Sequence, residues 1–112
     1  MSWSLFAAIS ARVGSIGDNR LGGWHSYRAS KAALNMATRN MSIELARSGV
    51  TAVALHPGTT DTDMSRPFQR NVRPEQLHTA EATASMLLGV VERLRPEDSG
   101  GFFAYDGSKI EW

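Results

Sequence analysis

The sequence predicts an α/β fold with a parallel sheet, and two observations lead to this prediction. Two short apolar runs, Leu5–Ser10 and Thr51–Leu55, lack a regular polar and apolar alternation, as expected of strands that are covered on both faces. Between them, the segment from Ser26 to Arg47 has the residue spacing of a helix. A strand, a helix and a strand in this order form a right-handed unit with parallel strands.

The rest of the chain continues this alternation. Ser65–Val72 predicts an irregular or short helical lid, and a second helix is expected from Pro74 or Thr79 to about Leu94. Phe102–Tyr105 predicts a third short strand. The expected order is therefore strand–helix–strand–helix–strand.

Both helices are expected to bury a face of small and apolar residues. Ser26 is a fair N-cap for the first helix, and Gly49 is expected to end it as a C-terminal cap. The predicted buried residues are Ala29, Ala32, Ala33, Met36, Ala37, Met41 and Leu45 in the first helix, and Ala80, Ala84, Leu87, Leu88 and Val91 in the second.

Composition restricts the class of protein. The chain has 112 residues, 42% of them hydrophobic and 21% charged, which is typical of one small globular domain. The formal net charge is +1 with both signs interspersed, so no nucleic-acid partner is expected. The absence of cysteine excludes disulfides, thiol catalysis and cysteine metal sites. No apolar run reaches the length of a membrane span, and a cytoplasmic protein without a membrane partner is expected.

Tyr27 and Lys31 are the first candidates for chemistry. Residues four apart lie on the same face of a helix, so the phenol and the ammonium group can address one small volume. A tyrosine normally keeps its proton until about pH 10, but a nearby cation favours the phenolate. Such a pair can donate and accept a proton near neutral pH. The same spacing also occurs on ordinary surface helices, so the surrounding sequence has to decide between the two interpretations.

Polar loops follow the first two strands, where ligands bind in open α/β sheets. Ser10 and Ser15 lie in or beside the first loop and could donate hydrogen bonds, although serines in such loops more often cap turns. The second loop begins with Pro57–Gly58, which forces a turn, and continues with three threonines. His56 precedes it and is more typical of a structural histidine than of a base. No spacing of metal ligands is found, so no metal site is expected.

These motifs together resemble the C-terminal half of a short-chain dehydrogenase/reductase, and they are most similar to the branch of C-factor and sniffer-type carbonyl reductases. The resemblance covers essentially Leu5 to Trp112. It rests on three blocks in this order and at these separations, Ser10–Ser15, Tyr27–Asn35 and Pro57–Met64, with Gly100–Phe103 and Asp106–Gly107 fitting as well. It implies a partial Rossmann-like, doubly wound parallel sheet.

The resemblance implies an NAD(P)-dependent oxidoreductase that reduces a carbonyl, or oxidises a secondary alcohol, by hydride transfer. Tyr27 would be the general acid and base, and Lys31 would favour its phenolate and bind the nicotinamide ribose. The Pro57–Gly58 loop would pass under the nicotinamide, and Thr60 and Thr62 would contact its carboxamide. The expected cofactor is NAD or NADP, with NADPH slightly favoured.

The resemblance also implies a serine that holds the substrate oxygen. Its usual position, judged from Gly14, falls on Ala11 in this chain. Ser10 directly precedes this position and Ser15 follows it. Of these two, Ser10 is the preferred candidate.

The glycine-rich dinucleotide loop of the family has no counterpart in this sequence. Residues 1–112 are therefore expected to be the C-terminal catalytic part of one domain, without the dinucleotide-binding half. The alternative is a truncated, non-catalytic fragment or a half-domain that acts only through association with another chain. The resemblance further implies a small carbonyl or alcohol substrate and a homo-oligomer formed through the helix that carries Tyr27.

Overall fold

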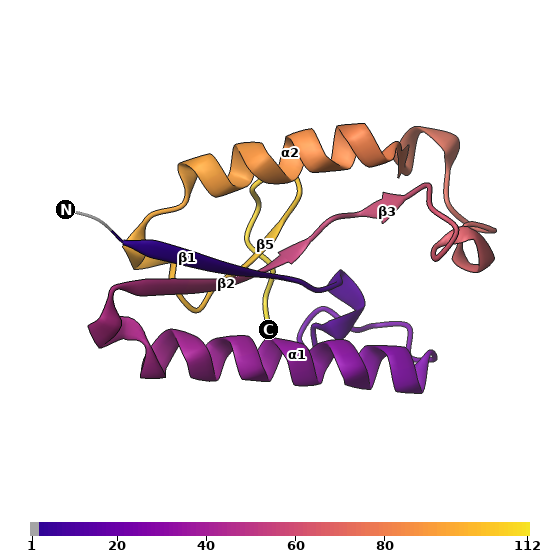
Figure 1. Cartoon of the computed structure of the whole chain (residues 1–112). Helices are drawn as coiled ribbons and strands as arrows, with labels where there is room; N and C mark the ends of the chain where they lie inside the picture. Colours follow the sequence, from indigo (N-terminus) through magenta and orange to yellow (C-terminus); the bar gives the residue numbers. More distant parts are fainter. Residues whose placement is uncertain (1–2) are drawn as a thin grey trace.

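The sheet and its two covering helices form the predicted architecture in a computed structural model, which describes residues 3–112. Strands β1 (Ser4–Ile9), β2 (Val50–His56) and β5 (Phe102–Ala104) form a parallel sheet in the order β1-β2-β5. Helices α1 (His25–Glu44) and α2 (Ala80–Arg93) lie on opposite faces of these strands (Figure 1). The predicted α/β class with a partial Rossmann-like, doubly wound parallel sheet is confirmed.

The register brings the carboxyl ends of the three strands to one edge of the sheet. Ile9 of β1 is paired with Leu55 of β2, and His56 of β2 is paired with Ala104 of β5. The loops that follow these strands therefore start next to one another. This is the edge at which open α/β sheets bind ligands.

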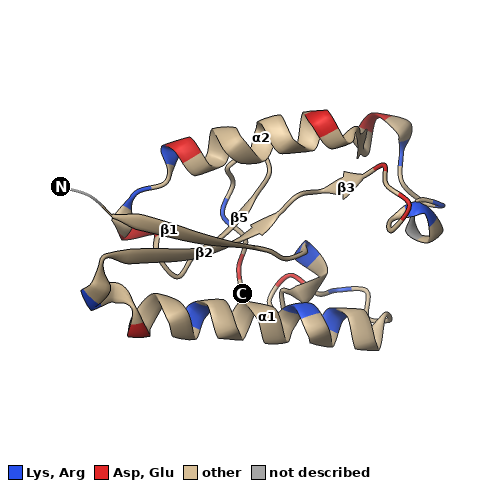
Figure 2. Cartoon of the chain, in the orientation of Figure 1, with Lys and Arg blue, Asp and Glu red and all other residues tan. Residues whose placement is uncertain are grey.

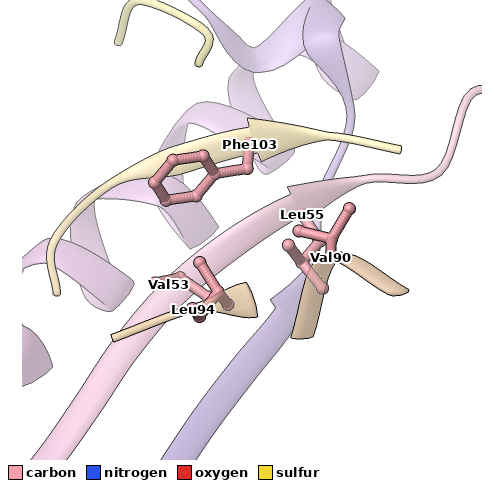
Figure 3. Close-up of a cluster of buried hydrophobic side chains, with 5 residues drawn as sticks. All are labelled: Val53, Leu55, Val90, Leu94 and Phe103. Carbon is pink, nitrogen blue, oxygen red and sulfur yellow. The ribbon is translucent and has the colours of Figure 1, made fainter. Parts of the chain in front are cut away.

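The hydrophobic core lies mainly between the sheet and α2. Five buried side chains meet there from three elements, Val53, Leu55, Val90, Leu94 and Phe103 (Figure 3). A second cluster covers the α1 face and consists of Ala54, Phe102, Ala104 and Ile110, with Trp112 stacked on Phe102 at 5.2 Å between ring centroids. The three strands of the sheet carry no charged residue, and the charges lie on helices and loops (Figure 2). Burial of each large side chain stabilises the fold by about 1.5–3 kcal/mol.

Helix α1 buries a different face from the one predicted. The buried residues are polar: Asn35, Thr38 and Ser42. The hydroxyls of Thr38 and Ser42 donate to the backbone carbonyls of Leu34 and Arg39, so their burial leaves no donor unpaired. Most of the predicted apolar face is exposed instead, including Ala29, Ala33, Met36, Ala37 and Leu45, while Ala32 and Met41 are half-buried.

The ends of α1 were predicted in part. Trp24 is the N-cap, and Ser26 lies inside the first turn, so the predicted N-cap is wrong. The α-helix ends at Glu44 and continues as a short 3₁₀ turn, Ala46–Ser48. Gly49 then adopts a φ of 73° and caps this end, as predicted.

Helix α2 begins at the later of the two predicted positions. The hydroxyl of Thr79 accepts a hydrogen bond from the backbone N–H of Ala82 at 3.1 Å, which makes it the N-cap. Leu87 and Val91 pack against the core, as predicted. Thr83 and Val90 are buried as well, although the sequence did not single them out. The other predicted residues, Ala80, Ala84 and Leu88, are exposed.

A second, two-stranded sheet was not predicted. Strand β3 (Thr59–Thr60) pairs in parallel with β4 (Leu77–His78), and these two-residue strands enclose the segment that contains two short 3₁₀ helices, Arg66–Phe68 and Pro74–Gln76. The first of these helices confirms the short helical character predicted there. Figure 1 shows that this segment extends beyond the carboxyl ends of the strands.

Strand β1 pairs with β2 alone within the described part of the chain. Its side chains are accordingly incompletely covered, because Phe6 is 42% exposed and Ile9 is 51% exposed. One edge of the sheet is therefore open. Within residues 3–112, no helix has the length and apolar character needed to cross a membrane.

Candidate active site

Tyr27 and Lys31 lie on the first two turns of α1 and face the same space. The Lys31 ammonium nitrogen Nζ lies 5.8 Å from the centroid of the Tyr27 ring. Lys31 Nζ also donates to the carbonyl oxygen of Ile9 at 3.3 Å, which holds its side chain at the carboxyl end of β1. The helical spacing therefore brings a phenol and a cation to the edge of the sheet where the loops begin.

A cleft of about 320 Å³ opens at this edge. Its walls come from the end of β1, the start of α1, the loop after β2 and the segment that follows β3. The predicted site residues that line it are Ser10, Tyr27, Lys31, Pro57, Gly58, Thr60 and Thr62. The three blocks of sequence singled out above are thus gathered around one cavity.

The two candidate serines are placed differently. Ser10 lines the cleft, but its hydroxyl donates to Asn35 Oδ1 at 2.6 Å in a buried contact. Ser15 lies away from the cleft, and its hydroxyl donates to the backbone carbonyl of Glu111 and accepts from the N–H of Asp18. Of the two serines, Ser10 alone lines the cleft with the other predicted site residues. Its hydroxyl proton is already used in the hydrogen bond to Asn35.

The Pro57–Gly58 turn needs a glycine at its second position. Gly58 has a φ of 75°, which residues with a side chain rarely adopt. A Cβ atom there would lie 2.9 Å from Cε1 of Tyr105 and 3.3 Å from Cε1 of His78. The loop is therefore packed closely on Tyr105, and Gly58 allows the backbone to form this wall of the cleft.

The threonines of the second loop serve its own structure as well as the cleft. The hydroxyls of Thr60 and Thr83 are 2.8 Å apart, which fastens the loop to α2. The hydroxyl of Thr62 accepts from the N–H of Ser65 at 3.2 Å. Ser65 in turn donates to the carbonyl of Thr60. The loop is thus held in shape by its side chains as well as by the β3–β4 pairing.

His56 also lines the cleft, and its contacts there were not predicted from the sequence. Its Nδ1 atom accepts a hydrogen bond from the backbone N–H of Arg12 at 3.0 Å, which ties the loop after β1 to the end of β2. Burial, followed by the charge of Arg12, lowers the pKa of His56 to about 4, against the opposing effects of Asp106 and Asp18. The ring is therefore neutral at pH 7, and its proton is on Nε2.

Other residues of the cleft also escaped the sequence-based prediction. Trp24, Met64 and Val72 line it together with Ile9 and Val13, so most of its wall is apolar. A signal was available for Trp24, because a large aromatic residue follows Gly22–Gly23 directly and precedes Tyr27 by three positions. Among the described residues, no group of three or more His, Asp or Glu side chains could hold a metal ion.

This arrangement can bind a small molecule and exchange a proton with it. The cleft combines apolar side chains with the phenol of Tyr27, the ammonium group of Lys31 and several other polar side chains, which is typical of small-molecule sites. A sequence profile of the short chain dehydrogenase family matches residues 10–73, more than half of the chain. The chain belongs to the short-chain dehydrogenase family.

Two curated relatives are similar to this protein over most of the chain. "C-signal" of Myxococcus xanthus is 42% identical over 106 residues, which cover 95% of this chain and 60% of that protein. The "1-hydroxy-2-glutathionyl-2-methyl-3-butene dehydrogenase" of Rhodococcus sp. strain AD45 is 40% identical over 104 residues, covering 93% of this chain and 45% of that protein. The chain thus spans about half the length of the curated relatives it matches.

Solved structures of carbonyl reductases are similar to all or nearly all of the chain. The carbonyl reductase Sniffer of D. melanogaster has a TM-score of 0.85 and 29% identity, with 100% of this chain and 44% of that chain covered. The NADPH-bound carbonyl reductase from chicken fatty liver has a TM-score of 0.85 and 36% identity, with 98% of this chain and 45% of that chain covered. The expected resemblance to carbonyl reductases of the short-chain dehydrogenase superfamily is confirmed.

Proposed function

We propose that this chain is the catalytic half of an NAD(P)-dependent oxidoreductase that reduces a carbonyl or oxidises a secondary alcohol. The observation that carries the proposal is the position of Tyr27 and Lys31, which face one cleft at the carboxyl edge of a parallel sheet. Membership of the short-chain dehydrogenase family and the carbonyl reductase neighbours support this class of reaction.

In the proposed reaction, Tyr27 gives its proton to the substrate oxygen during reduction and takes a proton from the alcohol in the reverse direction. Lys31 lies close enough for its positive charge to favour the phenolate of Tyr27. The same ammonium group can donate to the ribose hydroxyls of a nicotinamide cofactor, because it carries three donors and the contact with Ile9 O engages one of them.

We infer that the cleft holds the nicotinamide end of NAD(P). Gly58 lets the turn that forms this wall pack against Tyr105, and the neighbouring Pro57, Thr60 and Thr62 complete the wall. These residues would hold the nicotinamide and its carboxamide, while Tyr27 and Lys31 would hold the ribose. When bound, the cofactor supplies the hydride. Neighbouring structures are described with bound NADPH or NADP, which favours NADP for this chain.

Ser10 is the proposed second donor to the substrate oxygen. It is the nearest serine to the family position that Ala11 occupies, and it lines the cleft. Its hydroxyl would have to turn away from Asn35 or be released by it, since it donates to Asn35 in this structure.

The proposed activity depends on what covers the open edge of β1. The open edge of β1 and the exposed Phe6 and Ile9 support a half-domain that is covered by the dinucleotide-binding part of the same protein or by another chain. The exposed side of α1, which includes Ala33, Met36, Ala37 and Ile43, supports a homo-oligomer formed through the helix that carries Tyr27. The competing hypothesis is a non-catalytic half-domain that acts only through such association.

A chimeric protein tests the proposed activity. The chain would be joined to the N-terminal part of the chicken fatty-liver carbonyl reductase that has no counterpart here, and incubated with acetophenone and NADPH deuterated at the transferred position. We expect 1-phenylethanol with deuterium at its alcohol carbon. The isolated N-terminal part and the isolated chain are the controls. A folded chimera that binds NADPH but forms no deuterated alcohol would contradict the oxidoreductase proposal and favour the non-catalytic half-domain.

A further inference from the structure

Tyr105 follows β5 directly and lies in a tight turn. The backbone N–H of Gly107 donates to the carbonyl of Ala104 at 2.9 Å, which closes a β-turn. Gly107 has a φ of 87°, a conformation that glycine adopts without strain. The carboxylate of Asp106 accepts hydrogen bonds from the N–H and the hydroxyl of Ser108 at 3.0 Å and 2.6 Å. The backbone of this turn therefore fixes where the side chain of Tyr105 begins.

The ring of Tyr105 packs against the Pro57–Gly58 turn. A Cβ atom on Gly58 would lie 2.9 Å from Cε1 and 3.0 Å from Cδ1 of Tyr105, so this edge of the ring lies directly against the backbone of Gly58. The ring of His78 in β4 meets Tyr105 nearly edge to face, with 4.8 Å between the ring centroids and 71° between the planes. Tyr105 thus connects the loop after β2 with β4.

Tyr105 supports the cleft without lining it. Pro57, Gly58 and Thr60 line the cleft, whereas Tyr105 does not, and Tyr105 is half-buried. Gly58 has no side chain that would separate its backbone from the ring. A shift of the turn toward the ring would widen the cleft, and a side chain that gives way would allow such a shift. The width of the cleft at this wall therefore depends on the size and stiffness of the residue at position 105.

We propose that Tyr105 is a positioning residue, which acts through Gly58 and holds the Pro57–Gly58 wall at the distance that the nicotinamide end of NAD(P) requires. This role rests on the proposed function, because it assumes that the nicotinamide binds at this wall. The β-turn fixes the base of the side chain, and the ring of His78 restricts its rotation. A ligand-binding wall keeps its geometry when the residues behind it are themselves locked by packing.

Two ligands measure this role in the chimera described above. NADPH reaches both halves of the binding site, whereas adenosine 2′,5′-bisphosphate is its adenine-containing part and cannot contact the Pro57–Gly58 wall. Their Kd values are measured by calorimetric titration, so that turnover is not needed. We expect Tyr105→Leu to weaken the binding of NADPH by about 3- to 10-fold and to leave the binding of the bisphosphate unchanged. An equal loss for both ligands would overturn the positioning role, because it would reflect a general disturbance of the fold.

A graded series makes the test independent of any one variant. Tyr105→Phe keeps the ring edge that meets Gly58, so it should bind NADPH as tightly as the unsubstituted chimera. Tyr105→His has a flat but smaller ring and should show an intermediate loss. Trp112→Leu is the matched control, because it removes the aromatic pair with Phe102, 5.2 Å between centroids, away from the cleft. It should leave the affinity for both ligands unchanged. A loss in Tyr105→Phe as large as that in Tyr105→Leu would overturn the role of the ring edge.

The outcomes separate this role from the proposed function. A chimera that forms the deuterated alcohol, but in which Tyr105→Leu binds NADPH as tightly as the unsubstituted protein, would overturn the role of Tyr105 and leave the oxidoreductase standing. A selective loss of NADPH affinity in a chimera without turnover would support the positioned wall and count against the oxidoreductase. Unchanged binding of NADPH in Tyr105→Leu, in a chimera without turnover, would overturn both.

Discussion

Ser10 and Asn35 are joined by a buried hydrogen bond of 2.6 Å that ties the carboxyl end of β1 to the middle of α1. The Nδ2 atom of Asn35 is buried and has no partner in the described structure. A half-turn of the amide would place Nδ2 against the Ser10 oxygen, so that Asn35 donates and the serine proton is released toward the cleft. An unpaired buried N–H is less common than an unpaired carbonyl, which favours this second arrangement. In the proposed function, the orientation of the Asn35 amide would decide whether the Ser10 proton is available to a substrate oxygen.

Substitution of Ser10 tests this relationship in the active chimera. If Ser10 holds the substrate oxygen, Ser10→Ala should lower kcat by about 10²–10³-fold, as expected for the loss of one such donor. Asn35→Asp should have a similar effect, because a carboxylate can only accept and would keep the serine proton. Ser15→Ala is the control, since Ser15 lies away from the cleft, and kcat should change little. A Ser10→Ala variant with unchanged kcat would reduce the pair to a structural contact.

Gly58→Ala should destabilise the chain by about 1–3 kcal/mol, measured as the free energy of unfolding in urea. The added Cβ would meet Tyr105 at 2.9 Å, and the φ of 75° would be strained. The cost should be smaller in a Tyr105→Ala background, which removes the contact and keeps the backbone strain. Gly89→Ala should instead be neutral or stabilising, because it lies in open space on α2. An unchanged stability of Gly58→Ala would show that the turn is not packed as described.

The stability of the chain should depend on pH through His56. Its pKa is lowered to about 4 in the folded chain and is about 6.5 when unfolded, so the unfolded state binds more protons between these values. The free energy of unfolding should therefore be unaffected by His56 above about pH 6.5 and should fall by up to about 3 kcal/mol as the pH approaches 4. Asp106, whose pKa is lowered mainly by the hydroxyl of Ser108, acts below this range.

Urea unfolding at several pH values, from pH 4.5 to pH 7.5, measures this dependence. His56→Asn keeps an acceptor for the N–H of Arg12 and removes the titration, so its unfolding free energy should vary less with pH. His25→Asn, at the exposed start of α1, should keep the wild-type dependence. If the free energy of unfolding changes with pH equally in His56→Asn and in the wild type, burial of a neutral His56 is not the cause of the pH dependence.

The hydroxyl pair of Thr60 and Thr83 should contribute a measurable coupling. Their oxygens are 2.8 Å apart and join the loop after β2 to α2. In a double-mutant cycle with Thr60→Val and Thr83→Val, which preserve side-chain shape, we expect a coupling free energy of about 0.5–1.5 kcal/mol. Thr59→Val, at the neighbouring position of β3, serves as the comparison. Strict additivity of the two substitutions would mean that the pair does not hold the loop.

The sheet and the edge that carries the cleft could be predicted because they depend on local signals. Short apolar runs such as Thr51–Leu55 are too short for a helix, and the polar loops that follow them meet at one edge of a parallel sheet. The helical spacing of Tyr27 and Lys31 was enough to place them on a common side. These features need no knowledge of distant contacts.

The faces of the helices could not be predicted from hydrophobicity, because burial here depends on hydrogen bonds. Asn35 Oδ1 accepts a hydrogen bond from the Ser10 hydroxyl, and the Thr38 hydroxyl donates to the Leu34 carbonyl, which offsets part of the cost of burying these polar side chains. Met36 is 64% exposed although it is among the most apolar residues of α1. The small sheet of β3 and β4 was missed for a similar reason, since each strand has two residues and depends on a partner far away in the sequence.

The most direct test of the central claim is the turnover of the NADPH-loaded chimera after Tyr27→Phe, which removes the phenol hydroxyl and keeps the ring. If Tyr27 is the acid and base of carbonyl reduction, kcat should fall by about 10²–10⁴-fold, the usual contribution of general acid–base catalysis, while the Kd for NADPH changes little. Retention of kcat within about threefold of the unsubstituted chimera would contradict the account, because proton transfer would then not depend on Tyr27.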